Sequence, residues 1–264
     1  MTSPILLTGG TGTLGRRVAP LLREAGYPLR VLSRRGHESG GGVAFVTGDL
    51  ASGEGIDAAV DGVETIVHCA GSAKGDEVKT RHLVVAAAAA GAQHLVFISV
   101  VGADRVPVRT GVDRALFGYF AAKLAAERVL ADSGLPWTTL RATQFYDAML
   151  KVARQMAKLP VIPIPAGIRF QPVDTGEVAT RLVELSLGKP AGLVPDLAGP
   201  RSYEMKQLVR SYLQAAHRPR LMMPVRFPGK AARAIRGGAN LAPDRAVGRR
   251  TWEQFLAEQL PANR

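Results

Sequence analysis

Short apolar runs alternate with longer helical patterns through the first half of the chain. The runs, rich in aliphatic and β-branched residues and typical of buried strands, lie at residues 5–8, 29–33, 44–47, 65–69, 95–99 and 137–141. Apolar positions at helical spacing between them predict helices over residues 15–25, 83–90 and 115–133. This alternation predicts βαβ units, and therefore an α/β fold with a parallel sheet.

The rhythm changes in the second half, where Pro and Gly become frequent from Lys158 onward. The pattern there predicts a short strand over 221–226 and helices over 175–187, 203–216, 230–236 and 250–258. Such a composition is typical of a loop-rich lobe rather than of another βαβ repeat. We therefore expect a first domain over residues 1–147 and a small C-terminal lobe over 148–264, packed with it as one compact unit.

Charge is spread unevenly along the chain. The 264 residues include 34 Lys and Arg against 22 Asp and Glu, a formal charge of +12, and 47% are hydrophobic, which supports a folded core and excludes a disordered chain. Residues 1–200 hold 21 basic and 18 acidic residues, whereas residues 201–264 hold 13 and 4. Arg226, Lys230, Arg233 and Arg236 follow helical spacing, a pattern that is usually a solvated face. No nucleic-acid fold accompanies it, so nucleic-acid binding is disfavoured.

Compartment and metal binding are constrained by few residues. The lone Cys69 excludes an internal disulfide, and the N-terminus lacks the charged and apolar regions of a signal peptide, so we expect a cytoplasmic protein. The uncharged window 83–103 is about long enough to span a bilayer, but residues 91–94 divide it into a helix and a strand, so no membrane span is expected. The five histidines are scattered, and we expect no metal site.

A glycine-rich loop follows the first predicted strand and opens a helix. Gly9, Gly12 and Gly15 permit a tight turn, a close approach of backbone to a pyrophosphate, and close packing of helix on sheet. The N–H groups at the start of the helix then face the phosphates. We therefore expect dinucleotide binding by Gly9, Thr11, Gly12, Thr13, Leu14 and Gly15.

The end of the second strand distinguishes two cofactors. NAD-binding sites place an acid there for the ribose hydroxyls, whereas an arginine accommodates the 2′-phosphate of NADP. Arg34 and Arg35 occupy this position and no acid is present. Although two exposed loop arginines are the simpler interpretation, their guanidinium groups suit a phosphate, and NADP(H) is favoured over NAD(H).

Two further strand ends lie at the same edge of the predicted sheet. Asp49 and Leu50 follow the third strand, where the carboxylate can accept a hydrogen bond from the adenine amine. Ala70 and Gly71 follow the fourth strand, where the backbone can pass close to the adenosine ribose. His68, in the fourth strand, is expected to be a packed histidine rather than a catalytic one.

Three residues form a candidate catalytic set. Ser99 ends the fifth strand, and Tyr119 and Lys123 lie four residues apart on one face of a predicted helix. A neighbouring ammonium favours the phenolate, so we expect Lys123 to lower the pKa of Tyr119 toward the working range of an acid–base group. Lys123 can also hold the nicotinamide ribose, and Ser99 can bind the substrate oxygen. The alternative is an amphipathic helix surface.

These motifs resemble the short-chain dehydrogenase/reductase superfamily, specifically its atypical NmrA-like branch. The resemblance extends to about residue 180 and rests on the segments 8–15, 48–50, 98–104, 119–127 and 133–138. It implies a doubly wound Rossmann sheet that binds NADP(H), and a small C-terminal substrate lobe. It also implies that Gln144, Phe145 and Tyr146 enter the substrate pocket, although Phe145 and Tyr146 fit core positions equally well.

Two functions follow from this resemblance. The first is an NADPH-dependent oxidoreductase that reduces a small carbonyl or quinone by hydride transfer, with Tyr119 as acid–base group beside Lys123 and Ser99. The second is a non-catalytic regulator that senses NADP and binds a protein partner, because the branch includes both kinds of protein. The retained Ser, Tyr and Lys favour the enzyme.

Overall fold

The computed structural model describes residues 2–72 and 75–260, which divide into two compact units. The first unit comprises residues 1–99, 118–141 and 176–195, and the second comprises residues 100–117, 142–175 and 196–264. Each unit therefore takes segments from distant parts of the sequence. The expected contiguous boundary after residue 147 stays a prediction.

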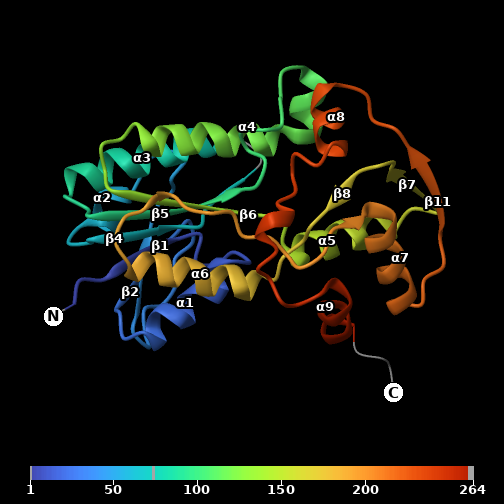
Figure 1. Cartoon of the computed structure of the whole chain (residues 1–264). Coiled ribbons are helices and arrows are strands. Elements are labelled where there is room, and N and C mark those ends of the chain that lie inside the picture. Colours follow the sequence, from blue (N-terminus) through green and yellow to red (C-terminus); the bar gives the residue numbers. More distant parts are fainter. Residues whose placement is uncertain (1, 73–74, 261–264) are drawn as a thin grey trace. The chain divides into compact units, whose positions relative to one another are not determined.

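A seven-stranded sheet forms the centre of the first unit (Figure 1). Its order is β3-β2-β1-β4-β5-β6-β9, with the parallel neighbours β1–β2, β1–β4, β2–β3, β4–β5 and β6–β9 in register. The strands are β1 (Ile5–Thr8), β2 (Leu29–Ser33), β3 (Val43–Thr47), β4 (Thr65–His68), β5 (His94–Val100), β6 (Trp137–Ala142) and β9 (Gly192–Leu193). The order 3-2-1-4-5-6 is that of a doubly wound Rossmann sheet, so the expected fold class is confirmed.

Helices cover both faces of this sheet. They are α1 (Gly15–Glu24), α2 (Ile56–Val60), α3 (Asp76–Ala89), α4 (Gly111–Ala131) and α6 (Thr175–Leu187). Figure 1 shows α2, α3 and α4 on one face and α1 and α6 on the other. Ile56 of α2, Leu83 of α3 and Leu130 of α4 pack in one continuous apolar core. This core includes Ile66 and Phe97 of the sheet. This packing fixes the strand ends that carry the candidate site.

The second unit has its own core, built from helices and two small ribbons. Its helices are α5 (Tyr146–Met156), α7 (Met205–Ala215), α8 (Lys230–Arg236) and α9 (Trp252–Gln259), with a short 3-10 turn η1 (Pro243–Arg245). β8 (Arg169–Phe170) pairs with β10 (Tyr203–Glu204), and β7 (Val161–Pro165) pairs with β11 (Leu221–Val225). Ile162, Leu208 and Trp252 lie in the apolar cluster that joins α5, α7 and α9 with the two ribbons.

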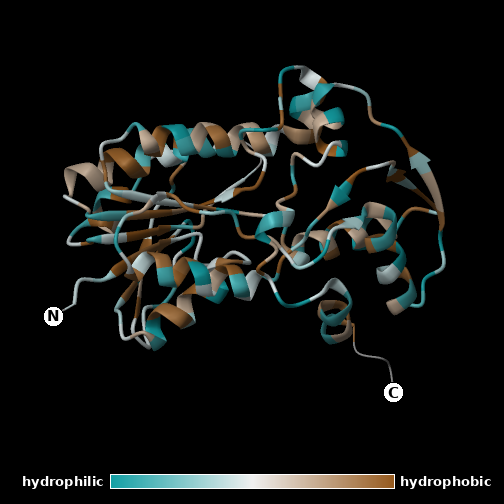
Figure 2. Cartoon of the chain, in the orientation of Figure 1, coloured by the Kyte–Doolittle hydropathy of each residue, from teal (hydrophilic) through white to brown (hydrophobic). Residues whose placement is uncertain are grey.

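The uncharged window at residues 83–103 contains two elements, as expected. α3 ends at Ala89 and β5 begins at His94. β5 is buried throughout, whereas α3 buries one side and leaves residues such as Val85 exposed. Figure 2 shows the hydropathy of both elements. In residues 2–72 and 75–260, no helix combines the length and apolar character needed to cross a membrane.

Candidate functional site

The glycine loop after β1 lies tightly against the end of β4. Gly9 has a φ of +71°, and a Cβ built on it would lie 2.6 Å from the backbone nitrogen of Ala70. A Cβ on Gly15 would lie 2.2 Å from the carbonyl oxygen of Gly9. Both distances are too short for any side chain, so glycine is required at these two positions.

The opposite side of this loop is open to solvent. Thr11, Gly12 and Thr13 are exposed, and Gly12 N–H donates to Gly9 O over 2.9 Å. At the start of α1, Leu14 provides no side-chain cap, and the first turn contains no acid. An anion at this point would meet backbone N–H groups and the positive end of the helix dipole. The loop therefore fits the pyrophosphate of a dinucleotide.

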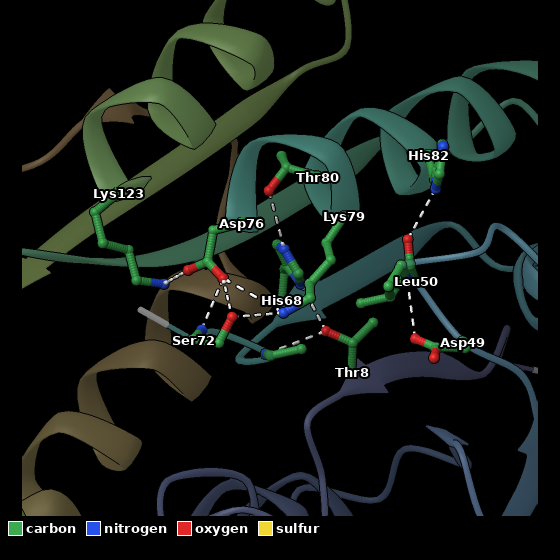
Figure 3. Close-up of polar contacts among 12 residues, drawn as sticks. Thr8, Asp49, Leu50, His68, Ser72, Asp76, Lys79, Thr80, His82 and Lys123 are labelled. Carbon is green, nitrogen blue, oxygen red and sulfur yellow. Dashed lines mark hydrogen bonds and ion pairs between the residues drawn. The ribbon is translucent and has the colours of Figure 1, made fainter. Parts of the chain in front are cut away.

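Two neighbouring strand ends complete the expected cofactor edge. Arg34 and Arg35 follow β2 and are exposed. After β3, one carboxylate oxygen of Asp49 accepts the backbone N–H of Ala51 over 2.9 Å, which fixes the turn. The Leu50 side chain is buried, and its carbonyl oxygen lies 2.8 Å from the His82 ring (Figure 3). These contacts hold the loop backbone in place and leave both arginines available to a ligand.

His68 lies at the end of β4 among buried groups. Its ring nitrogens lie 2.7 Å from the Thr8 hydroxyl and 3.3 Å from the Thr80 hydroxyl, and its ring stacks on Phe97. Burial, aided by the charges of Lys123 and Lys79, lowers the pKa of His68 to about 3. His68 is therefore neutral near pH 7 and serves packing, as expected.

The Lys123 ammonium is buried near the carboxyl end of β5 (Figure 3). Its Nζ lies 3.2 Å from a carboxylate oxygen of Asp76, donates to the carbonyl of Ile98 over 3.2 Å, and sits 4.7 Å above the centre of the Phe97 ring. A Cβ on Gly71 would lie 2.7 Å from the same atom. A side chain at position 71 would therefore displace this ammonium from its place beneath the loop that follows β4.

Asp76, the first residue of α3 and the ion-pair partner of Lys123, is also buried and hydrogen-bonded. It is 1% exposed, and its second carboxylate oxygen accepts the backbone N–H of Ser72 over 2.7 Å. Lys79 donates to the Ser72 hydroxyl over 2.6 Å and lies 3.8 Å from the same carboxylate. The result is a buried Asp76–Lys123 ion pair braced by the loop before α3 (Figure 3).

Tyr119 lies one helical turn before Lys123 on α4. The Lys123 Nζ is 5.8 Å from the centre of the Tyr119 ring, and 41% of the tyrosine surface remains exposed. Burial and then the negative charge of Asp76 raise the pKa of Tyr119 to about 12. The expected lowering of this pKa is therefore wrong, because Asp76 balances the charge of Lys123 and desolvation disfavours the phenolate.

Ser99 lies near the end of β5, one residue after the carbonyl that Lys123 contacts. The serine is 3% exposed, and its hydroxyl has no hydrogen-bond partner within the described residues. A buried hydroxyl without a partner is costly and calls for an explanation, such as a ligand. Ser99, Tyr119 and Lys123 all belong to the first unit, where Lys123 contacts the carbonyl next to Ser99 and lies near the Tyr119 ring.

The three expected pocket residues at positions 144–146, shortly after β6, belong to the second unit and differ in environment. Both polar atoms of the Gln144 amide are buried without a partner in the described part of the chain. Phe145 is half-buried at the start of α5. Tyr146 is fully buried, donates its hydroxyl to the carbonyl of Arg250 over 2.6 Å and stacks with the aromatic rings of α9. These contacts account for Tyr146 as a core residue rather than a pocket residue, whereas Gln144 keeps unused hydrogen-bonding groups.

Asp76 is the main site residue that the sequence interpretation missed. An acid in the first turn of a helix is ordinary, because it favours the helix dipole. Its role depends on a lysine 47 positions later, a pairing that only the sheet topology brings together. In residues 2–72 and 75–260, no group of three or more His, Cys, Asp or Glu side chains is arranged to hold a metal ion.

Comparison with known proteins identifies the family. A family model described as NAD(P)H-binding matches residues 9–159, more than half of the chain. A (4-alkanoyl-5-oxo-2,5-dihydrofuran-3-yl)methyl phosphate reductase of Streptomyces griseus is 33% identical over 220 residues, covering 81% of this chain and 74% of the relative. An NAD(P)H azoreductase of Xenophilus azovorans is 28% identical over 224 residues, with the same two coverages.

The solved structures agree with this family at the level of the fold. An NADPH-dependent quinone oxidoreductase of Escherichia coli, complexed with NADPH, superimposes with a TM-score of 0.79 over 97% of this chain and 99% of that chain, at 19% identity. The expected NAD(P)-binding Rossmann family is thus confirmed. The chain belongs to the NAD(P)H-binding family of oxidoreductases.

Proposed function

We propose that the chain reduces a small carbonyl or quinone with NADPH. The observation that carries this proposal is the buried Ser99 hydroxyl without a partner, in the unit that also holds the glycine loop, Tyr119 and Lys123. Such a donor is positioned for a ligand oxygen rather than for the protein. The similarity to a reductase and an azoreductase supports a reductive role.

The cofactor would lie along the strand ends. The backbone at Thr11–Leu14 would hold the pyrophosphate, and Arg34 or Arg35 the 2′-phosphate, which supports NADP(H) over NAD(H). Asp49 and Leu50 would border the adenine. Ala70 and Gly71 would border the adenosine ribose, and Lys123 the nicotinamide ribose.

Bound NADPH supplies a hydride to the substrate carbon or quinone ring. Ser99 donates a hydrogen bond to the substrate oxygen, which orients the acceptor and stabilises the charge that develops on this oxygen. Tyr119 holds its proton at neutral pH, since its pKa is about 12. A protonated phenol suits donation to an alkoxide, so the arrangement supports reduction rather than alcohol oxidation near pH 7.

The test is NADPH oxidation against matched panels of carbonyls and quinones. Removing a general acid costs typically 10²–10⁴-fold, so Tyr119→Phe should lower carbonyl reduction by about that factor. A quinone becomes a stabilised anion on hydride transfer and depends less on an enzyme acid, so its rate should change by less than about tenfold. Ser99→Ala should weaken both reactions by about 10²-fold. Equal carbonyl turnover by wild type and Tyr119→Phe would exclude the acid role.

One observation favours the second candidate, a non-catalytic NADP-sensing regulator that binds a protein partner. Asp76 balances the charge of Lys123, which removes the influence that would activate Tyr119 as a base. The regulator hypothesis predicts that the chain binds NADPH tightly but turns over no acceptor. It also predicts that Tyr119→Phe leaves the interaction with the protein partner unchanged. Turnover of any carbonyl or quinone that responds to Ser99→Ala decides for the enzyme.

A further inference from the structure

A small parallel ribbon in the second unit exposes an apolar outer face. β7 and β11 pair with Leu221 beside Val161 and Met223 beside Pro163 (Figure 1). The alternate residues point the other way, and Ile162 is fully buried in the core. Leu221 is 73% exposed, Met223 54% and Val161 42%. A strand with one solvent-exposed face normally places polar residues on that face. The exposed face of this ribbon carries apolar residues instead, which is unusual for a surface in contact with water.

The sequence around this ribbon is strongly basic. Residues 148–173 contain four Lys or Arg, and residues 205–243 contain eight, without a single Asp or Glu in either stretch. The second stretch accounts for most of the excess charge in the C-terminal part of the chain. Lys158 lies just before β7, Arg218 lies just before β11 and Arg226 follows it, and all three are exposed. The apolar face is therefore bordered by cations at both ends of its strands.

Some basic side chains near the ribbon hydrogen-bond to the protein backbone, whereas the three at the strand ends form no ion pair in the described part of the chain. The Arg220 guanidinium donates to the carbonyl of Ala157 over 3.2 Å, and Arg236 donates to the carbonyl of Phe227 over 2.8 Å. No ion pair within the described residues involves Lys158, Arg218 or Arg226. Their charges are thus free to meet an anionic partner.

We propose that the β7–β11 ribbon docks on an anionic lipid surface. Leu221, Met223 and Val161 would enter the headgroup region, while the neighbouring Lys and Arg contact lipid phosphates. Nucleic acid would satisfy the cations but would leave the apolar side chains in water. A second copy of the chain would place like charges opposite each other, which disfavours that pairing. This surface lies outside the proposed reductase chemistry and does not depend on it.

The test is co-sedimentation of the full chain, with NADPH present, on vesicles of phosphatidylcholine with or without about 30% phosphatidylglycerol. Only the anionic vesicles should bind the chain, and salt should weaken the binding. Each cation at an anionic surface contributes about fivefold. The combined Lys158→Gln, Arg218→Gln and Arg226→Gln variant should therefore bind about 100-fold more weakly. Leu221→Gln with Met223→Gln should weaken binding at least tenfold.

Matched control variants remove the same numbers of exposed basic and apolar side chains from the first unit. Arg23, Arg128 and Lys189 are exposed on the first unit, and their triple change to Gln should alter vesicle binding by less than about threefold. The exposed Val85 and Leu187, both changed to Gln, serve as the apolar control. NADPH binding, measured for every variant, confirms that each one is folded.

Three outcomes would overturn the proposal. The first is equal binding to neutral and anionic vesicles, and the second is anionic binding that the ribbon variants leave unchanged. The third is a different occupant. Duplex DNA bound more tightly than vesicles, or a dimer that Leu221→Gln and Met223→Gln dissociate without any vesicle binding, would assign the face to nucleic acid or to a second copy.

Discussion

The buried Asp76–Lys123 pair offers the sharpest perturbation of the site. Asp76→Asn keeps the shape of the side chain and an oxygen that can accept the Ser72 N–H, but it removes the negative charge opposite Lys123. The lysine ammonium then keeps the Ile98 carbonyl as a close acceptor while 2% exposed. We expect a large loss of stability, because an uncompensated charge remains buried.

The size of this loss follows from the geometry. Two unit charges 3.2 Å apart attract by about 5 kcal/mol at an effective dielectric constant near 20. Removing one partner of a buried pair typically costs about 3–5 kcal/mol of unfolding free energy. For a chain of this length, that corresponds to a decrease in Tm of roughly 6–20 °C.

The assay is thermal unfolding of wild type, Asp76→Asn, Lys123→Met and the double variant, each between pH 6 and pH 10. Because removing both charges leaves no buried ion, the double variant should be more stable than Asp76→Asn alone. Burial lowers the pKa of Lys123 and Asp76 raises it. Without Asp76 the lysine loses its proton at lower pH, so the deficit of Asp76→Asn should be largest at low pH and shrink as the pH rises.

Two results would refute this reasoning. One is an Asp76→Asn variant within about 0.5 kcal/mol of wild type, the range of ordinary surface substitutions. The other is a double variant whose loss equals the sum of the two single losses, since independent sites are additive.

Three further predictions concern the same edge of the sheet. The pKa of His68 is 6.5 in the unfolded chain and about 3 in the folded chain, so the neutral ring stabilises the fold fully above pH 6.5. The free energy of unfolding should fall by up to about 5 kcal/mol as the pH falls from 6.5 toward 3. The difference in unfolding free energy between wild type and His68→Gln, measured with urea, should follow this change, and a difference that does not vary with pH contradicts it. Arg34→Gln with Arg35→Gln should weaken NADPH binding by roughly 10- to 100-fold and NADH binding by less than about threefold in calorimetry, with Arg23→Gln as control; equal loss for both cofactors excludes a role at the 2′-phosphate. Gly15→Ala should abolish dinucleotide binding because its methyl would lie 2.2 Å from the Gly9 carbonyl, whereas Gly118→Ala, in open space, should bind normally.

Local signals in the sequence were sufficient to predict the Rossmann half of the fold. The strands at residues 5–8 and 29–33 match β1 and β2, and the other four differ from the observed strands by one residue at one or both ends. The runs of β1, β4 and β5 are strongly apolar because these strands are buried almost throughout, whereas β3, at the edge of the sheet, is only partly buried. The glycine loop was equally readable, since its spacing is a direct consequence of backbone crowding at Gly9 and Gly15.

Elements whose stability comes from distant contacts were missed or shortened. α2 has five residues, too few for a periodic pattern, and β7 contains Pro163 and Pro165, which normally argue against a strand. α3 begins at Asp76 rather than at residue 83, because its polar first turns are stabilised through Ser72 and Lys123. The rise in the pKa of Tyr119 was missed for the same reason, because its causes, first burial and then the charge of Asp76, both come from contacts distant in sequence.

A crystal structure of the chain with NADP⁺ is the most direct test of the proposed site. We predict the pyrophosphate against the backbone of Thr11–Leu14, the 2′-phosphate within hydrogen-bond distance of Arg34 or Arg35, and the nicotinamide C4 facing Ser99 and Tyr119. A nicotinamide turned away from both hydroxyl groups, or a dinucleotide bound outside the glycine loop, would contradict the assignment of this edge as a reductase site.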